Sequence, residues 1–136
     1  MADARAPRIF IAEDDEAILD LLVTRLRIAG YHTSHERDGL AALETIKRTR
    51  PNACILDVNM PSLDGFSVLK RLRADPSTAH VPILILTARR GTDDIKTAIR
   101  LGATDYMSKP FNDEQLLARV ARLLRKRADT SRVVYV

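Results

Sequence analysis

The chain is 136 residues long and 46% hydrophobic, which fits one globular domain with a core of its own. Its single cysteine, Cys54, excludes an internal disulfide. Neither a signal peptide nor the ~20-residue apolar run of a membrane span is visible, so we expect a cytoplasmic protein without membrane attachment. The net charge of +4 is uneven, because residues 115–136 carry six bases and one acid, which favours a tail or protein-docking face over direct nucleic-acid binding.

Strand-like and helix-like patterns alternate from the N-terminus. Residues 8–12 are predicted to form a short buried strand, and apolar residues at helical spacing follow over residues 17–28. Gly30 ends this helix, because glycine readily adopts the left-handed conformation found at helix ends. A weaker strand over residues 31–35 leads into a second helix over residues 39–48.

The middle of the chain continues the same alternation. Residues 53–57 are predicted to form a third strand, and a loop of turn-forming residues follows at 59–65. A helix over residues 66–73 ends before Pro76, which cannot continue it. Residues 81–87 are continuously apolar up to a terminal threonine, and this pattern predicts a fourth, fully buried strand.

The C-terminal part completes an α/β protein. A helix over residues 92–101 is closed by Gly102, a fifth strand is predicted over residues 104–107, and Asn112 caps a final helix. Five strands that alternate with five helices predict a doubly wound parallel sheet with helices on both faces. Ligands of such folds bind beyond the carboxyl ends of the strands.

Acidic residues gather at those predicted strand ends. Glu13 and Asp14 follow the first strand, and Asp57 stands at the end of the third. Three carboxylates in one cleft would repel one another strongly, and a divalent cation with hard oxygen ligands, such as Mg²⁺, would remove that repulsion. For Asp15 and Glu16 we favour a different explanation, in which they complement the positive N-terminus of the following helix.

Two further strand ends supply a cation and a hydroxyl group. Lys109 follows the fifth strand, where its ammonium would hold Asp57 or a phosphoryl oxygen, and Thr87 ends the fourth. A threonine at a strand end is, taken alone, more often a turn residue than a ligand. Together with the carboxylates, these residues supply a nucleophile, a metal site, a cation and a hydrogen-bond donor, which are the parts that phosphoryl transfer needs.

These residues lie in four motifs that resemble the receiver domain of two-component response regulators. The motifs are IFIAEDD at residues 9–15, ILDVNMPSLDG at 55–65, PILILTA at 82–88 and GATDYMSKPF at 102–111. The resemblance covers about residues 8–126. It implies a flavodoxin-like fold with strand order 2-1-3-4-5. We accordingly expect a flexible N-terminal arm at 1–7, the receiver at 8–126, and a C-terminal tail or linker start at 127–136.

The resemblance also implies a role for each site residue. Asp57 would accept the phosphoryl group from a sensor histidine kinase or phosphotransfer protein, and Thr87 and Lys109 would bind its oxygens. Tyr106 would be the aromatic switch residue that turns inward when Thr87 moves. The implied Mg²⁺ ligands are Asp14, Asp57, the Asn59 carbonyl and, through water, Glu13. Glu13 stands where aspartate is more frequent in the family, and Asn59 and Arg89 occupy variable positions that tune dephosphorylation.

The expected output is control of a downstream protein through the face formed by residues 92–101, residues 104–107 and the last helix. That face would also support a homodimer. We expect no enzymatic activity beyond the chain's own phosphorylation and dephosphorylation. A stand-alone regulator is favoured over a receiver cut from a longer protein with a DNA-binding or enzymatic output domain. A haloacid-dehalogenase-type phosphatase is disfavoured, because its general acid would stand at position 59, where Asn59 cannot transfer a proton.

Overall fold

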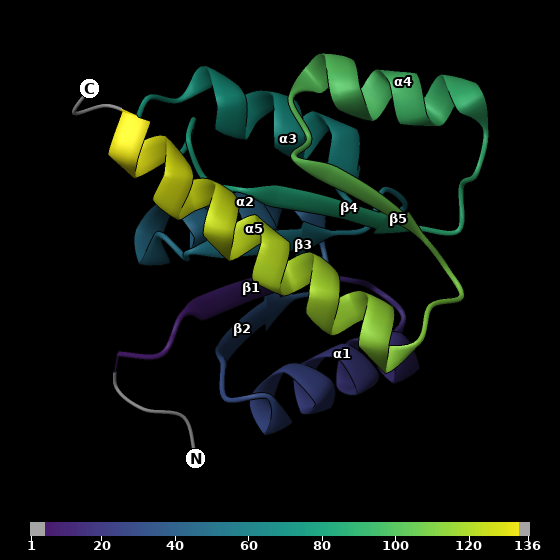
Figure 1. Cartoon of the computed structure of the whole chain (residues 1–136). Helices are drawn as coiled ribbons and strands as arrows, with labels where there is room; N and C mark the ends of the chain where they lie inside the picture. Colours follow the sequence, from purple (N-terminus) through teal and green to yellow (C-terminus); the bar gives the residue numbers. More distant parts are fainter. Residues whose placement is uncertain (1–4, 134–136) are drawn as a thin grey trace.

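The computed structural model describes residues 5–133, with side chains described up to residue 125. Five parallel strands form one sheet in the order β2-β1-β3-β4-β5 (Figure 1). The strands are β1 (Arg8–Ala12), β2 (His32–Glu36), β3 (Ala53–Leu56), β4 (Ile83–Thr87) and β5 (Asp105–Ser108). The helices are α1 (Glu16–Ile28), α2 (Gly39–Thr49), α3 (Gly65–Ala74), α4 (Thr92–Leu101) and α5 (Asp113–Val133). The predicted doubly wound, flavodoxin-like fold and its strand order are confirmed.

Two hydrophobic clusters lie on opposite faces of the sheet. Phe10 and Leu56 point to the face covered by α2, α3 and α4, whereas their chain neighbours Ile11 and Ile55 point to the face covered by α1 and α5. Strands β3 and β4 are buried at every position, and apolar except for the terminal Thr87, because both of their faces are covered. This double cover leaves the loops at the ends of the strands as the place for polar chemistry.

Aspartates start three of the helices at the end of the sheet that carries those loops. The side chains of Asp15, Asp38 and Asp64 accept hydrogen bonds from backbone N–H groups in the first turns of α1, α2 and α3. Each cap fixes the point where a loop becomes a helix. The loops after β1, β2 and β3 therefore end at fixed positions, which helps to hold the side chains of these loops in place relative to one another.

The boundaries differ from the sequence prediction at several ends. β4 begins at Ile83, two residues later than predicted, and β5 lies one residue further along the chain. The backbone of α5 continues to Val133, past residue 127, where we expected the tail to begin. Of the predicted arm and tail, residues 1–4 and 134–136 lie outside the described residues. No helix within the described part of the chain is long and apolar enough to cross a membrane.

Candidate functional site

Asp57 is the first residue after β3, at the carboxyl end of the sheet. Its backbone N–H donates to the carbonyl of Ala12 (3.0 Å), and its carboxylate Oδ1 accepts a hydrogen bond from the Val58 N–H (2.7 Å). Gly65, the first residue of α3, packs so closely that a Cβ there would collide with the Asp57 carbonyl oxygen. The surrounding backbone therefore sets the direction of a carboxylate whose residue is only 6% exposed.

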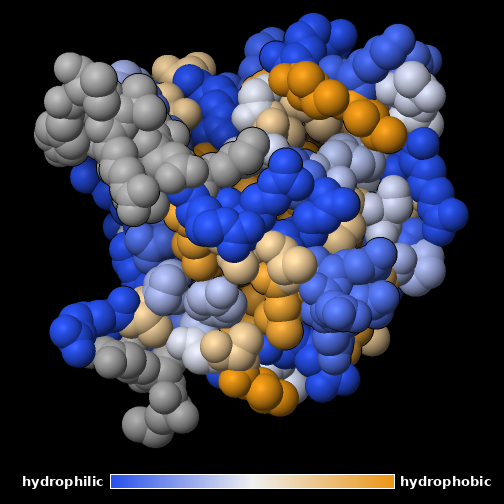
Figure 2. All heavy atoms as spheres, in the orientation of Figure 1, coloured by the Kyte–Doolittle hydropathy of each residue, from blue (hydrophilic) through white to orange (hydrophobic). Residues whose placement is uncertain are grey.

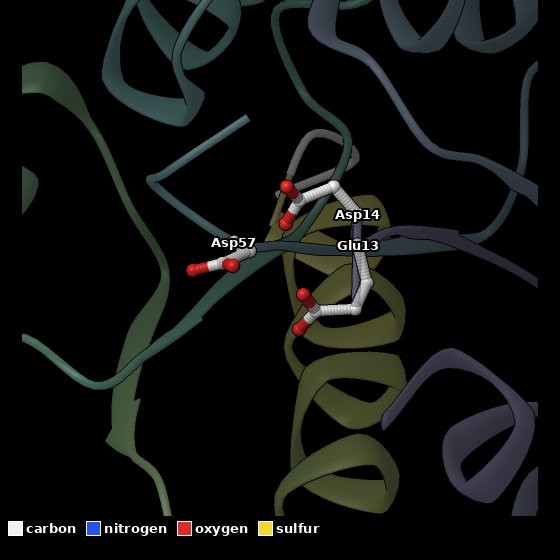
Figure 3. Close-up of side chains that lie close together, drawn as sticks. All are labelled: Glu13, Asp14 and Asp57. Carbon is white, nitrogen blue, oxygen red and sulfur yellow. The ribbon is translucent and has the colours of Figure 1, made fainter. Parts of the chain in front are cut away.

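Glu13 and Asp14 lie beside Asp57 because β1 and β3 are neighbours in the sheet. One oxygen from each of these three carboxylates lies within 4.8 Å of the other two (Figure 3). Glu13 and Asp57 are buried, whereas Asp14 is partly exposed. The predicted convergence of the strand ends is therefore present in the structure. The donor set consists of hard oxygens and has the chemistry that suits Mg²⁺.

Lys109 reaches into this acidic cluster from the loop after β5. Its Nζ lies 2.5 Å from Glu13 Oε1 and 3.2 Å from Asp57 Oδ2. Its backbone is held from two sides, since its N–H donates to the Thr87 carbonyl (2.9 Å) and its own carbonyl accepts from Arg90 Nη2 (2.8 Å). One ammonium group thus contacts two of the three carboxylates.

The charges of this cluster shift the pKa values of its members. Burial raises the pKa of Glu13 to about 7, against the hydrogen bond from Lys109, and the charge of Asp57 adds to the rise. Burial works against the Lys109 ammonium, but the hydrogen bond to Glu13 and the charge of Asp57 outweigh it and raise the Lys109 pKa. The ammonium is therefore firmly charged, whereas the Glu13 carboxylate is protonated more easily than an ordinary glutamate.

Thr87 and Tyr106 lie on neighbouring strands next to this cluster. Thr87 ends β4 and is fully buried, and its Oγ1 accepts a long hydrogen bond from the Arg89 N–H (3.4 Å). Tyr106 lies on β5, and its hydroxyl donates to the Arg89 carbonyl (2.5 Å). Both side chains therefore contact the same short segment, the start of the loop between β4 and α4.

Contacts of two arginines around the site escaped the sequence prediction. Arg89 Nη2 donates to Asn59 Oδ1 (2.8 Å) and Nη1 to Asp94 Oδ1 in α4 (3.4 Å), so it joins the loop after β3 to the first turn of α4. Arg37, from the loop after β2, donates twice to the backbone carbonyl of Asp14. No pattern in the sequence marks such contacts, because every residue offers a carbonyl and long side chains select partners only in the folded chain.

Comparison with known proteins identifies the family. Residues 9–121 match the family described as the response regulator receiver domain. The chain belongs to this family. The receiver is 43% identical to the transcriptional regulatory protein PrrA of Mycobacterium leprae (strain TN), over 93% of this chain and 53% of PrrA. It is 42% identical to the DNA-binding dual master transcriptional regulator RpaA of Synechocystis sp. (strain ATCC 27184 / PCC 6803 / Kazusa), over 88% of this chain and 50% of RpaA.

The receiver spans about half the length of these curated relatives. Among solved structures it resembles the receiver domain of the sensor histidine kinase PA1611 from Pseudomonas aeruginosa PAO1, with a TM-score of 0.82 and 30% identity. This match covers 88% of the receiver and 98% of the PA1611 domain, whose structure has a magnesium ion coordinated in the active site cleft. The likeness in fold thus extends over nearly all of the solved domain.

Proposed function

We propose that this receiver accepts a phosphoryl group on Asp57 from the phosphohistidine of a sensor histidine kinase or phosphotransfer protein. The observation that carries the proposal is the packing of the Asp57 carboxylate against Lys109 and the carboxylates of Glu13 and Asp14. Structural ion pairs seldom place three acids around one base, because the excess negative charge costs free energy. A site that binds a divalent cation and a phosphoryl group uses that excess.

The residues present fit Mg²⁺. Asp14 and Asp57 would hold the ion with the Asn59 carbonyl, and Glu13 would contribute nearby. When bound, Mg²⁺ neutralises negative charge on the phosphoryl oxygens and so favours attack by a carboxylate. Asp14 is the least buried member of the cluster, which leaves the ion a route of entry from solvent.

The transfer itself exchanges one bond for another. A carboxylate oxygen of Asp57 forms a bond to phosphorus while the bond between phosphorus and the imidazole nitrogen breaks. The imidazole leaves with the electron pair and regains its proton from solvent. Lys109 would hold one phosphoryl oxygen through its ammonium and Thr87 another through its hydroxyl. The chain would thus promote only its own phosphorylation and dephosphorylation.

The proposed output is a change in the face formed by α4, β5 and α5. This face carries exposed Ile99 on α4, and Figure 2 shows apolar surface over α4 beside hydrophilic surface. A downstream protein, or a second copy of the chain, would dock there. Because RpaA is described as DNA-binding, we limit the expectation of no nucleic-acid contact to the receiver fold itself. A stand-alone regulator and a receiver with an attached output domain share this face, and the length of the reading frame distinguishes them.

The decisive experiment is phosphorylation by a small acyl phosphate with Mg²⁺. Intact-mass spectra should show one added phosphoryl group that is labile in base, and Asp57→Asn should remove it because an amide is a poor nucleophile. Asp64→Asn, at the exposed N-cap of α3, is the matched control and should be labelled like the wild type. Equal labelling of Asp57→Asn and wild type would move the acceptor elsewhere.

A further inference from the structure

A short segment that joins β2 to the first residues of α2 touches both loops that carry the carboxylates of the site. We call residues Arg37, Asp38, Gly39 and Leu40 the 37–40 segment. Three of these residues contact the loop after β3, which is the loop that begins with Asp57. The fourth, Arg37, contacts the loop after β1. The segment is itself fixed at the start of α2 because Asp38 caps that helix.

The contacts to the loop after β3 are close and specific. The Gly39 N–H donates to the Pro61 carbonyl (3.1 Å), and the Leu40 N–H donates to Ser62 Oγ (3.2 Å). Ser62 Oγ in turn donates to Asp38 Oδ1 (3.1 Å). Ser62 has a φ of 65°, a left-handed conformation that a non-glycine residue keeps only where its surroundings hold it. A Cβ at Gly39 would also collide with the backbone of this loop.

Arg37 extends the connection to the loop after β1. Its Nε and Nη2 donate to the backbone carbonyl of Asp14, at 3.2 Å and 2.7 Å. Both donors come from one planar group and meet one oxygen, which restrains that peptide more than a single hydrogen bond would. The Asp14 side chain leaves from the same residue towards Asp57 (Figure 3).

We propose that Arg37 is a positioning residue for divalent-cation binding. Through the 37–40 segment it holds the Asp14 peptide at a fixed place relative to the loop that follows Asp57. The proposal rests on the proposed function, since it assigns Arg37 to the same cation site. Arg37 donates to a backbone carbonyl and acts on the ion only through the placement of the Asp14 carboxylate.

A positioning role of Arg37 can be separated from a simple charge effect, because the two change the affinity for Mg²⁺ in opposite directions when Arg37 is removed. A cation near the site repels Mg²⁺, so removal of the Arg37 charge alone would strengthen Mg²⁺ binding. Loss of the clamp on Asp14 would weaken binding, because a ligand that must first be ordered binds a metal less tightly. The direction of the change in Kd therefore decides between them.

The test is calorimetric titration of Mg²⁺ into metal-free wild type and four variants at one pH and ionic strength. Arg37→Ala and Arg37→Gln should raise the Kd for Mg²⁺ about tenfold. Arg37→Lys keeps one donor, and its Kd should lie between the Kd of these two variants and that of the wild type. Arg71→Ala, at an exposed position in the last turn of α3, removes the same charge and should change Kd about twofold or less. An unchanged or lowered Kd in Arg37→Ala would overturn the proposal.

A second measurement tests Arg37 without the metal. The Asp15 amide belongs to the peptide whose carbonyl Arg37 contacts, so its nitrogen resonance reports that contact in the metal-free protein. Arg37→Ala should move this resonance upfield, and Arg71→Ala should leave it in place. If Arg37→Ala leaves it unmoved, the clamp is absent and the proposal fails. A wild type that binds no Mg²⁺ at all would instead overturn the metal assignment of the proposed function.

Discussion

Lys109 is the residue on which the charge balance of the metal-free site depends. From the sequence we expected the free carboxylate cluster to be repulsive, and the structure shows one ammonium group shared between Glu13 and Asp57. Its positive charge compensates part of the negative charge of these two carboxylates. Lys109 and a bound divalent cation would therefore compete in part for the same carboxylates, although each is needed for phosphoryl transfer in the proposed function.

Lys109→Ala should make the metal-free protein less stable and more responsive to Mg²⁺. Removal of one partner of a buried ion pair leaves its carboxylates unpaired, and we expect the free energy of unfolding to fall by about 2 kcal/mol at neutral pH. Mg²⁺ should restore much of this loss and should stabilise the variant more than it stabilises the wild type. Urea unfolding with and without Mg²⁺ measures both effects. Lys70→Ala, at an exposed position on α3, is the control. An equal Mg²⁺ effect in wild type and Lys109→Ala would contradict this competition.

Cys54 should be inert in the folded protein. It lies fully buried in β3, and burial raises the pKa of its thiol to about 12. The thiolate, which is the nucleophile, is therefore absent at neutral pH, and reagents cannot reach the sulfur. A thiol-reactive chromogenic disulfide at pH 8 should label the protein only in denaturant. Rapid labelling under native conditions would show that β3 opens far more often than a central strand should.

Gly65 is the position where an element boundary bears most directly on the site. A Cβ there would collide with the Asp57 carbonyl oxygen, whereas a Cβ at Gly91, the N-cap of α4, would make only an ordinary contact with Asp94. Gly65→Ala should therefore lower the free energy of unfolding by about 2 kcal/mol or more and reduce phosphorylation. Gly91→Ala should cost about 1 kcal/mol or less. Thermal unfolding compares the two, and equal costs would refute the close approach.

At the scale of elements, the sequence predicted which segments are strands and helices better than where they begin. The run 81–87 is apolar up to Thr87, but it includes Pro82, which has no N–H to donate to a neighbouring strand. Its carbonyl bonds to Cys54, and the assigned ladder starts one residue later. Thr104 was predicted to open β5, but its hydroxyl accepts from the Ile83 N–H (3.0 Å), a side-chain contact where the strand was expected. Hydrophobic periodicity reports burial, and both segments make a backbone hydrogen bond to a neighbouring strand without belonging to the strand that follows them.

The site shows the same division between what a pattern can and cannot indicate. The approach of Glu13 to Asp57 followed from strand order, because the carboxyl ends of neighbouring parallel strands meet. The contacts of Arg37, Arg73 and Arg89 could not be predicted from strand order. Arg73, for example, donates to the carbonyls of Ala79 and Val81 in the link that follows α3, and to the carbonyl of Gly102 after α4. Such contacts depend on the final packing of the loops, about which residue type carries no information.

At the scale of the molecule, the site and the proposed docking face are linked through the loop after β4. The Tyr106 hydroxyl donates to the Arg89 carbonyl, while the Arg89 side chain joins Asn59 beside the site to Asp94 in α4. A phosphoryl group on Asp57 brings about −1.5 to −2 charges and three acceptor oxygens. It would attract both the Arg89 guanidinium and the Thr87 hydroxyl. Either change alters the loop against which Tyr106 packs, and with it the start of α4.

A phosphoryl mimic should therefore change the structure well beyond Asp57. With beryllofluoride and Mg²⁺, we expect amide resonances to shift in α4, β5 and α5 as well as around the acceptor. The mimic shifts the balance between two packings only as far as it contacts them differently. Thr87→Ala should keep phosphorylation but weaken the distant shifts, because the hydroxyl that draws the loop inward is gone. Thr78→Ala, a buried threonine in the link between α3 and β4, should keep the distant shifts in full. If all shifts in the wild type stay around Asp57, phosphorylation produces no conformational change at the docking face, and the proposed coupling is wrong.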